Sequence, residues 1–597
     1  MANLKKLLFL LSHYERKRAI LLLVMILFMA IIDMLGVASI MPFIAVLTNP
    51  DLVETNTMLN KAYINSSIFG VESKQQFLFA LGVFVFLLLI LSLAFKALTN
   101  YAQVRFTTMR EFSIGKRLVE GYLHQPYSWF LNRHSSDLSK TILSEVNMVV
   151  SKGLGPMMNL ITQITVTIAL LILLILVDPK LTLIIVLTFS TAYGLIYKFN
   201  RNLMSRIGKE IFKANQERFA ALTEAFGASK EVKVGGLEQI YIKRFSDPAQ
   251  NLAKISALEA IISQLPRFTL EAIAFGGMLL VVLYLMLQSG DIANVIPIIA
   301  LYAFAGYRLM PALQLIYISL TQLRIVGPSL DSIYDDLISL QPMVRDKDKS
   351  PIQLNKDIRL NQIYYQYPKA SRTALKDINL IIPARTTVGL VGATGSGKTT
   401  TADIILSLLD SQKGTLEVDG IKINKHNRES WQRTIGYVPQ HIFLADDTIT
   451  SNIAFGVNPK KIDLEAVEHA AKIANLHEFV INELPLQYKT TVGERGVRLS
   501  GGQRQRIGIA RALYHKPKLL ILDEATSALD NLTEQAVMEA VHNLRKNITI
   551  ILIAHRLSTV KKCDQIFLFD KGKLDAQGTF DELIKLSDNF RETAKNL

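Results

Sequence analysis

Six apolar stretches, each long enough to cross a lipid bilayer as a helix, constrain this chain more than any other feature. A membrane-spanning helix needs about 20 consecutive apolar residues, and half of the 597 residues are hydrophobic. The sequence therefore predicts an α-helical membrane protein over its N-terminal half. The predicted spans are Ala19 to about Leu47, Phe77–Thr99, Met157–Val177, Leu181–Phe199, Leu270–Gln288 and Val295–Gln322.

Basic residues indicate which side of the membrane each connection occupies. Residues 101–152 and 198–267, after the second and fourth spans, are long, charged and helix-prone. Since Lys and Arg concentrate on the cytoplasmic side, we expect these segments and both termini there, with the spans continuing as helical stalks. The N-terminus superficially resembles a signal peptide, but its apolar run is too long and contains Asp33. We therefore expect an uncleaved first span.

The net charge of +15 admits a second interpretation, because a basic protein can bind nucleic acid. Basic residues also collect beside membrane spans, where they attract anionic lipid and set orientation. The membrane interpretation is favoured, and we expect no nucleic-acid partner. Cys563 is the only cysteine, which excludes an internal disulfide and a cysteine-based metal cluster.

The C-terminal part of the chain has a different pattern. A linker at 326–356, rich in Asp, Lys, Ser and Pro, separates the predicted membrane domain (1–325) from a C-terminal domain (357–597). There, strand-like apolar runs alternate with helical patterns, which is typical of an α/β nucleotide-binding domain. The predicted fold class is a six-span helical membrane domain joined to an α/β phosphate-loop domain.

The segment Gly392-Ala-Thr-Gly-Ser-Gly-Lys398-Thr399 predicts a phosphate-binding loop. It follows a predicted buried strand and opens a predicted helix, which is the context that such a loop needs. Backbone amides then donate to the phosphates, Lys398 neutralises the β- and γ-phosphates, and Thr399 ligates magnesium. ATP and Mg²⁺ are the expected cofactors. The predicted phosphate-loop contacts are Gly392, Thr394, Gly395, Ser396, Gly397, Lys398, Thr399 and Thr400.

Two carboxylates end a second predicted strand, Leu519–Leu522. Asp523 is expected to hold Mg²⁺ through water, and Glu524 to polarise the attacking water as the general base. Two solvated acids at a strand end are the alternative. That alternative is weak beside a phosphate loop.

Leu499-Ser-Gly-Gly-Gln503 resembles the signature motif of ABC transporters, and the chain as a whole resembles their exporter type. In that family the motif contacts the nucleotide bound by a second subunit. The resemblance therefore implies a homodimer in which both sites hydrolyse ATP. The signature residues expected to contact nucleotide are Ser500, Gly501, Gly502 and Gln503.

The same resemblance assigns roles to single residues. Tyr367 resembles the aromatic residue that stacks on adenine, although a turn tyrosine is the alternative. Gln440 resembles the glutamine that touches magnesium and reports to the membrane domain, and His555 the histidine that contacts the γ-phosphate. Asp530 resembles a residue of the loop that crosses to the opposite nucleotide site. Glu494 resembles the residue that contacts the partner's stalks.

Two cytoplasmic segments resemble coupling helices, which dock a membrane domain on an ATP-binding domain. The first is 127–137, with aromatic and polar ends, and the second surrounds 224–233. A plain surface helix turn is the alternative for both, and only the first segment is specific enough to reject it.

Charged residues stand nearly alone inside the predicted spans at Asp33, Lys96, Glu271 and Arg308, with Arg267 at the entry of the fifth span. Each costs about 2.5–3.5 kcal/mol at bilayer depth on insertion scales, so such groups face a water-filled cavity or a charged partner. The three basic residues suit a cavity for an anionic phosphate or pyrophosphate head group. Mutual pairing, for example of Asp33 or Glu271 with Arg308, is an equal alternative, and Lys96 and Arg267 can also snorkel to the interface.

A narrower resemblance links the membrane region to bacterial flippases of lipid-linked oligosaccharides. It rests on Met41-Pro42-Phe43-Ile44, on Pro266-Arg267 leading to Leu270-Glu271, and on Tyr307–Pro311. It implies that the outer loop, Thr48–Gln76, engages a lipid tail, and that the protein lies in the bacterial inner membrane with its ATP-binding domain in the cytoplasm.

The expected function is thus ATP-driven flipping of a lipid-linked oligosaccharide with a pyrophosphate head group. Export of other lipids, peptides or hydrophobic drugs is the alternative within transport. Outside transport, a soluble ABC ATPase is disfavoured by the six spans, and an ATP-gated channel by the intact Glu524.

Overall fold

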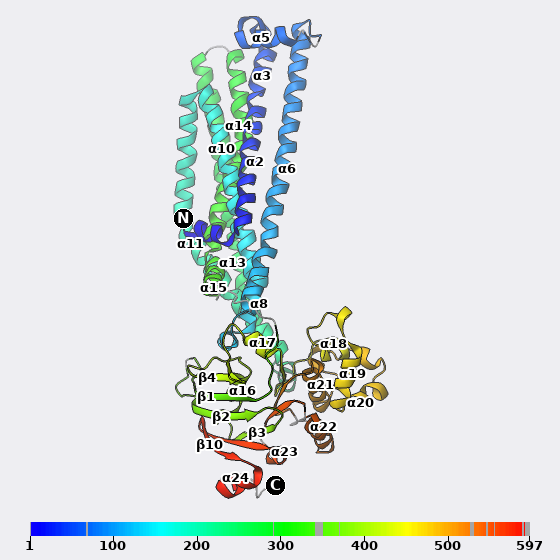
Figure 1. Cartoon of the computed structure of the whole chain (residues 1–597). Coiled ribbons are helices and arrows are strands. Elements are labelled where there is room, and N and C mark those ends of the chain that lie inside the picture. Colours follow the sequence, from blue (N-terminus) through cyan, green and yellow to red (C-terminus); the bar gives the residue numbers. More distant parts are fainter. Residues whose placement is uncertain are drawn as a thin grey trace. The chain divides into compact units, whose positions relative to one another are not determined.

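The structure is a computed structural model in which two compact units are described separately. The membrane unit comprises residues 1–125 and 132–342, and the nucleotide unit comprises 126–131 and 343–597 (Figure 1). The predicted linker contains a helix, 327–339, and the domain boundaries at 325 and 357 remain predictions. The described residues are 2–66, 68, 70–289, 292–340, 350–368, 370–525, 531–544, 547–554, 556–587, 590 and 591.

Long uninterrupted helices build the membrane unit, because apolar spans and helix-prone polar segments follow one another without a break. Helix α6 runs for 50 residues, from Lys74 to Leu123, after a capping box in which Ser73 and Gln76 cap each other. At 1.5 Å per residue it is about 75 Å long, more than twice the hydrocarbon core. Helix α11, Pro179–Gly227, likewise continues well beyond bilayer length, and the assignment of these extensions as cytoplasmic stalks remains a prediction.

The remaining helices of this unit form the other spans, the outer loop, the other stalk segments and the start of the linker. Two π-helical turns, η2 and η3, interrupt the third long helix towards its N-terminal end. The elements are α1 Ala2–Leu10, α2 His13–Ala38, α3 Ile40–Thr48, α4 Leu52–Thr55, α5 Thr57–Ser66, α8 Ser135–Lys140, η2 Thr141–Glu145, α9 Val146–Val149, η3 Val150–Leu154, α10 Gly155–Val177, α12 Ser229–Val234, α13 Glu238–Ser289, α14 Ile292–Ile325 and α15 Gly327–Ser339.

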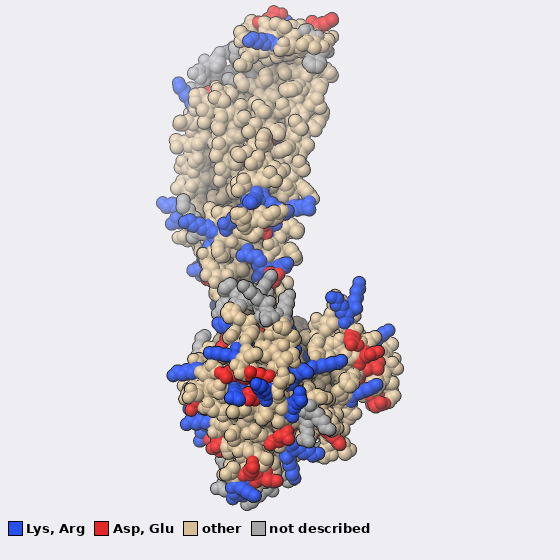
Figure 2. Space-filling model, in the orientation of Figure 1, with Lys and Arg blue, Asp and Glu red and all other residues tan. Residues whose placement is uncertain are grey.

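Five stretches of described helix are long and apolar enough to cross a membrane: 13–48, 74–123, 135–177, 179–227 and 299–325. They correspond to predicted spans one to four and six. Predicted span five lies within α13, where most side chains fall outside the described part of the chain. Figure 2 shows that the visible surface of these spans carries few charges, whereas Lys and Arg gather where the stalks begin.

Helices α11 and α14 approach each other closely at Gly208. A Cβ atom built there would lie 2.2 Å from the carbonyl oxygen of Ile325, the last residue of α14. Such a distance is impossible without a shift of backbone, so glycine is required for this packing. Gly194, on the same helix, has nothing within 4 Å of its own Cβ position and provides a matched comparison.

We therefore expect opposite effects from the same substitution at these two positions. Gly208→Ala should destabilise the membrane unit by about 1–3 kcal/mol through overpacking. Gly194→Ala should be neutral or slightly stabilising, because alanine favours a helix by about 1 kcal/mol over glycine. Thermal unfolding of the detergent-solubilised protein measures both, and equal effects of the two substitutions would contradict this packing.

Two sheets form the core of the nucleotide unit. One is antiparallel, in the order β2-β1-β4-β5, and the other has six strands in the order β10-β9-β3-β8-β7-β6. In the second sheet, all neighbouring pairs from β9 to β6 are parallel. The strands are β1 Asp357–Tyr365, β2 Leu375–Pro383, β3 Thr387–Gly392, β4 Lys413–Val418, β5 Ile421–Lys422, β6 Ile435–Val438, β7 Leu519–Asp523, β8 Thr549–Ile553, β9 Gln565–Asp570 and β10 Lys573–Gly578.

Burial on both faces explains why β3, β7 and β8 read as continuous apolar runs rather than as alternating ones. The carboxyl ends of parallel strands meet at one edge of a sheet, where α/β proteins bind their ligands. The helices of this unit are α7 Tyr127–Phe130, α16 Lys398–Ile405, α17 Arg428–Gln432, α18 Ile449–Ile453, α19 Leu464–Ile473, α20 His477–Glu483, α21 Gly501–Tyr514, α22 Asn531–Asn543, α23 Leu557–Val560 and α24 Phe580–Leu586, with short 3-10 turns at 459–461, 487–489 and 494–496.

Candidate ATP site and membrane charge cluster

The predicted phosphate loop connects the central strand β3 to helix α16. Gly392 ends the strand with φ +147°, and a Cβ atom there would lie 2.2 Å from the carbonyl oxygen of Phe569. Gly397, directly before the helix, has φ +111°. Both positions need glycine, for close approach and for a left-handed conformation. The loop thus presents its amides and the N-terminus of α16, an arrangement suited to binding phosphate.

Lys398 is buried at the first position of α16. Its Nζ donates to the carbonyl oxygens of Gly392 and Ala393, at 2.7 and 3.0 Å. Burial lowers the pKa of this ammonium, and the nearby carboxylates of Glu524 and Asp523 partly oppose that effect. The side chain is therefore held across the loop at the place where phosphate charge would accumulate.

The other loop residues differ in exposure. Thr394, Gly395 and Thr399 are exposed, whereas Ser396 is buried and its Oγ has no hydrogen-bond partner among the described residues. An unpaired buried hydroxyl fits a site that a phosphate completes. The hydroxyl of Thr400 lies 3.1 Å from that of Tyr367.

Tyr367 lies beside the first turn of α16, and its ring packs edge-on against Tyr365 with centroids 5.0 Å apart. Burial raises the pKa of its phenol, and the bond to Thr400 opposes that effect. The ring is thus placed next to the phosphate loop. Its stacking on adenine remains a prediction.

Asp523 and Glu524 lie at the carboxyl end of β7, at the same edge of the sheet as the phosphate loop. Asp523 ends β7 and is 5% exposed. Glu524 has φ +49°, rare for a residue with a side chain, and its amide donates to the carbonyl oxygen of Ile553 on β8. Gln440, just after β6, donates from Nε2 to Oε2 of Glu524 at 2.8 Å. Gln440 and Glu524, 84 positions apart along the chain, thereby meet at one edge.

The signature motif opens helix α21. The Ser500 Oγ accepts from the amide of Gln503 at 3.2 Å, and the Gln503 side chain accepts from the amide of Ser500 at 2.8 Å. This capping box exposes Ser500 at a helix N-terminus, with Gly501 and Gly502 in the first turn. Two further predicted contacts, Asp530 and His555, lie outside the described residues.

Sequence reasoning missed two residues of this site. Asp403 is the only acid in helix α16, and burial together with the Asp523 charge raises its pKa to about 6. Tyr437 lies on β6 three residues before Gln440, and burial raises the pKa of its phenol. The lone acid in α16 was the available signal for Asp403.

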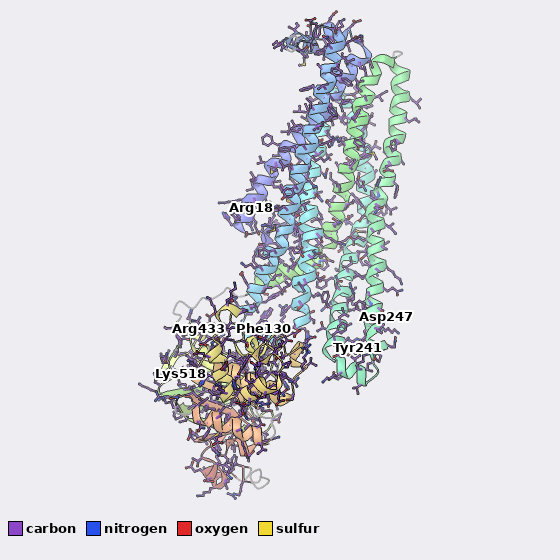
Figure 3. All side chains as sticks on the ribbon, turned by 90° about the vertical axis from the view of Figure 1, so that its right-hand side faces the viewer. Arg18, Phe130, Tyr241, Asp247, Arg433 and Lys518 are labelled. Carbon is purple, nitrogen blue, oxygen red and sulfur yellow. The ribbon has the colours of Figure 1, made fainter. Side chains whose placement is uncertain are left out.

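The first predicted coupling segment belongs by its contacts to the nucleotide unit. Residues 126–131, which form α7, group with that unit although the chain on both sides groups with the membrane unit. Tyr127 of α7 raises the pKa of both Tyr367 and Tyr437, after burial and nearer groups. Phe130 marks this helix in Figure 3. Tyr127 is thus near enough to Tyr367 and Tyr437 of the candidate ATP site to affect their ionisation.

In the membrane unit, two of the lone charges form an ion pair. Nη1 of Arg308, on α14, lies 3.1 Å from Oδ1 of Asp33, on α2. The Ser92 hydroxyl, on α6, donates to the same Oδ1 at 3.0 Å. Lys96 lies one turn further along α6, on the face of Ser92. We call Asp33, Ser92, Lys96 and Arg308 the charge cluster.

Arg267 has a different partner. Its Nε donates to Oε1 of Glu271, one turn along α13, at 2.7 Å, and its side chain is 57% exposed. Both arginines therefore have an acidic partner, Arg308 in Asp33 and Arg267 in Glu271, and their place in an anion cavity remains a prediction. Among the described contacts, Lys96 has no ion-pair partner.

Comparison with known proteins places both halves of the chain. Residues 18–311 match the family of the ABC transporter transmembrane region, and residues 375–527 match the ABC transporter family. An ATP-dependent lipid A-core flippase of Cupriavidus metallidurans is 31% identical over 470 residues, which is 78% of each chain. The Heterocyst differentiation ATP-binding protein HepA of Nostoc sp. is 31% identical over 508 residues, 84% of this chain and 82% of that protein.

A solved structure has the same fold. A bacterial Atm1-family ABC exporter with ATP bound superimposes with a TM-score of 0.78, at 22% identity, over 97% of this chain and 98% of the exporter. The predicted fold class is confirmed. The chain is a multi-pass membrane protein with an ATPase coupled to transport, and it belongs to the ABC transporter family, as an exporter that carries its transmembrane and ATP-binding regions in one polypeptide.

Proposed function

We propose that this exporter flips a lipid-linked oligosaccharide with a pyrophosphate head group from the cytoplasmic leaflet of the bacterial inner membrane. The observation that carries the proposal is the charge cluster: Arg308, Asp33 and Ser92 meet within apolar spans, and Lys96, one helical turn from Ser92, adds a second cation. Its net charge is positive, so it attracts an anion that enters from the membrane. The flippase names of the curated relatives support a lipid cargo in general.

Arginine and lysine in the cluster offer complementary contacts to a diphosphate. A guanidinium presents several N–H donors in a plane that matches phosphate oxygens, and an ammonium adds a compact charge. Arg267 is exposed on α13 and supplies a third cation along the predicted cavity. A neutral lipid or hydrophobic drug gains nothing from these groups.

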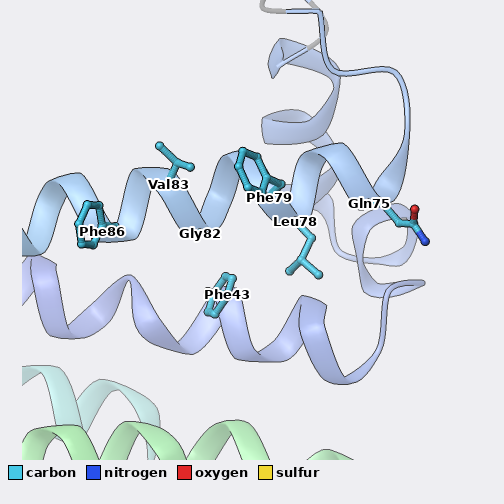
Figure 4. A pocket seen from close by; sticks show the side chains of 7 residues that line it. All are labelled: Phe43, Gln75, Leu78, Phe79, Gly82, Val83 and Phe86. Carbon is cyan, nitrogen blue, oxygen red and sulfur yellow. The ribbon is translucent and has the colours of Figure 1, made fainter.

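The lipid tail is proposed to stay in the bilayer against the outer ends of the first two spans. A groove of about 500 Å³ lies there between α3 and α6 (Figure 4). The outer loop beside it exposes Met58 and Ile64, at 82% and 62%. The groove is lined by Phe43, Gln75, Leu78, Phe79, Gly82, Val83 and Phe86.

At the ATP site, Thr399, Gln440 and Asp523 are proposed to hold Mg²⁺, which neutralises phosphate charge when bound. Their oxygen-containing side chains are the ligands that Mg²⁺ prefers. Glu524 then orients and deprotonates the attacking water, and His555 contacts the γ-phosphate. The nucleotide unit is proposed to face the cytoplasm.

A second copy of the chain is the proposed partner, because one chain offers an exposed signature motif and exposed apolar groups near the second coupling segment. Phe226 and Val234, on either side of the turn between α11 and α13, are 75% and 91% exposed. The start of α13 is marked by Tyr241 and Asp247 in Figure 3. In a homodimer Ser500, Gly501, Gly502 and Gln503 would complete the partner's nucleotide site, with Asp530 close to it.

Removal of the Arg308 guanidinium tests the proposal. In nanodiscs, a polyprenyl diphosphate should stimulate ATP hydrolysis and the uncharged polyprenol should not. Arg308→Ala should raise the half-saturating concentration of the diphosphate by about 10- to 100-fold, the effect of losing a hydrogen bond to a charged group.

Arg206→Ala is the matched control, because it removes an exposed arginine that pairs with Glu210 on the α11 stalk. It should leave the lipid response unchanged. Equal stimulation by polyprenol, or an unchanged response in Arg308→Ala, would favour the alternative cargo of other lipids, peptides or hydrophobic drugs.

A further inference from the structure

The Asp33–Arg308 pair is asymmetric in a way that a purely structural ion pair does not require. Asp33 is 2% exposed, whereas the Arg308 side chain is 15% exposed. The acid is sealed between helices while the base reaches an accessible surface. The accessible partner can therefore meet a ligand without any movement of the acid.

Both partners also keep unused bonding capacity. Only one nitrogen of Arg308 approaches one oxygen of Asp33, so the pair lacks the two parallel bonds that arginine and carboxylate form at their strongest. The other oxygen, Oδ2, is buried and has no hydrogen-bond partner among the described residues. A pair held by a single contact exchanges partners more readily than a saturated one.

Ser92, on α6, also bonds to the Asp33 carboxylate. Its hydroxyl donates to the same Oδ1 that faces Arg308. This donation lowers the negative charge available to the guanidinium. The strength with which Asp33 holds Arg308 is thus set by a neutral neighbour.

We propose that Asp33 is a resident counter-ion and positioning residue, which neutralises and orients Arg308 while the cavity is empty and yields it to the phosphate groups of an arriving anionic lipid. Two phosphate groups carry more negative charge than one carboxylate, so the lipid competes successfully for the guanidinium. Once the head group departs, Asp33 reclaims Arg308 and thereby favours release. This role rests on the proposed function, because it assumes that Arg308 receives the head group.

The counter-ion role predicts that two substitutions shift the half-saturating concentration of the lipid in opposite directions, which a general loss of folding cannot imitate. Asp33→Asn keeps the side-chain size but removes the competing charge. It should lower the half-saturating concentration of polyprenyl diphosphate by about three- to tenfold, the range of single polar contacts between membrane helices, and lower the maximal stimulated rate because release slows. Ser92→Ala removes the hydroxyl that donates to Asp33, so the carboxylate holds Arg308 more strongly. The half-saturating concentration should therefore rise by about two- to threefold.

The measurement is ATP hydrolysis by the full-length protein in nanodiscs, titrated with polyprenyl diphosphate, polyprenol or inorganic pyrophosphate at constant free Mg²⁺. Asp33→Glu, which restores the charge, should behave nearly as the unmodified protein. Glu210→Gln is the matched control, because it removes an acid from the exposed Arg206 pair on α11, and it should leave both parameters unchanged.

The outcomes separate this inference from the function on which it rests. An unchanged or raised half-saturating concentration in Asp33→Asn, while Arg308→Ala loses the response, would overturn the counter-ion role alone. A normal response in Arg308→Ala would overturn the proposed function. An equal response to inorganic pyrophosphate would assign a free anion as ligand and overturn the lipid cargo. If Asp33→Asn does not fold, Ser92→Ala decides, and an unchanged or lowered value there refutes the counter-ion role.

Discussion

Replacement of Glu524 by glutamine is expected to lower the rate of ATP hydrolysis by about 100- to 1,000-fold, within the range that a general base contributes. The substitution keeps the size of the side chain and an oxygen that can accept from Gln440, whose Nε2 lies 2.8 Å from Oε2 of the native carboxylate. The site should therefore retain its shape and its affinity for ATP. Only the group that takes the proton of the attacking water is lost.

Steady-state hydrolysis and equilibrium binding of ATP, measured on the same preparation, check this expectation. Glu465→Gln serves as the control, since Glu465 is an exposed acid in the first turn of α19. It should leave hydrolysis and binding unchanged. Persistent hydrolysis in Glu524→Gln would show that another group acts as the base.

Lys398→Ala is expected to weaken ATP binding by at least about 100-fold. The ammonium is buried at the start of α16 and is held by the carbonyl oxygens of Gly392 and Ala393. In the nucleotide complex we expect it to bind phosphate oxygens, and hydrogen bonds to charged groups contribute about 1.5–3 kcal/mol each. Loss of the cation removes several such bonds together, so affinity falls more than a single bond predicts.

Direct binding of ATP, with Mg²⁺ and with a chelator, measures this loss. Lys422→Ala removes an exposed lysine from β5 and should bind ATP normally. Because Lys398→Ala also leaves two loop carbonyls without their donor, thermal unfolding must be followed in parallel. Full ATP affinity in a folded Lys398→Ala protein would contradict the role of this residue.

Much of the ATP site could be read from the sequence, because its parts are local. A glycine-rich loop between a strand and a helix is a short segment whose chemistry depends on neighbouring residues, as Gly392 and Gly397 show by their positive φ angles. The capping box of Ser500 and Gln503 is equally local. Asp403 escaped notice because its importance comes from burial beside Asp523, a residue 120 positions away.

The sequence could not decide which charges in the membrane spans pair with each other. The sequence indicated that Asp33, Lys96, Glu271 and Arg308 are costly in apolar spans, and it allowed either Asp33 or Glu271 as the partner of Arg308. The choice depends on which helices face each other, and the structure pairs Arg308 with Asp33 while Glu271 pairs with Arg267 on its own helix. A period of 3.6 residues specifies the face of a helix but not the neighbour of that face.

The sequence by itself determined the spans with described side chains, the order of the motifs, the phosphate loop and the family, since each depends on hydrophobicity or on residues close together along the chain. Only the tertiary structure decided that α7 groups with the nucleotide unit, that Gln440 meets Glu524, and that Asp33, Ser92 and Arg308 converge from three helices. These contacts join residues tens to hundreds of positions apart. They arise because helices and strands bury their apolar faces against one another, and that packing determines which polar groups are brought within bonding distance.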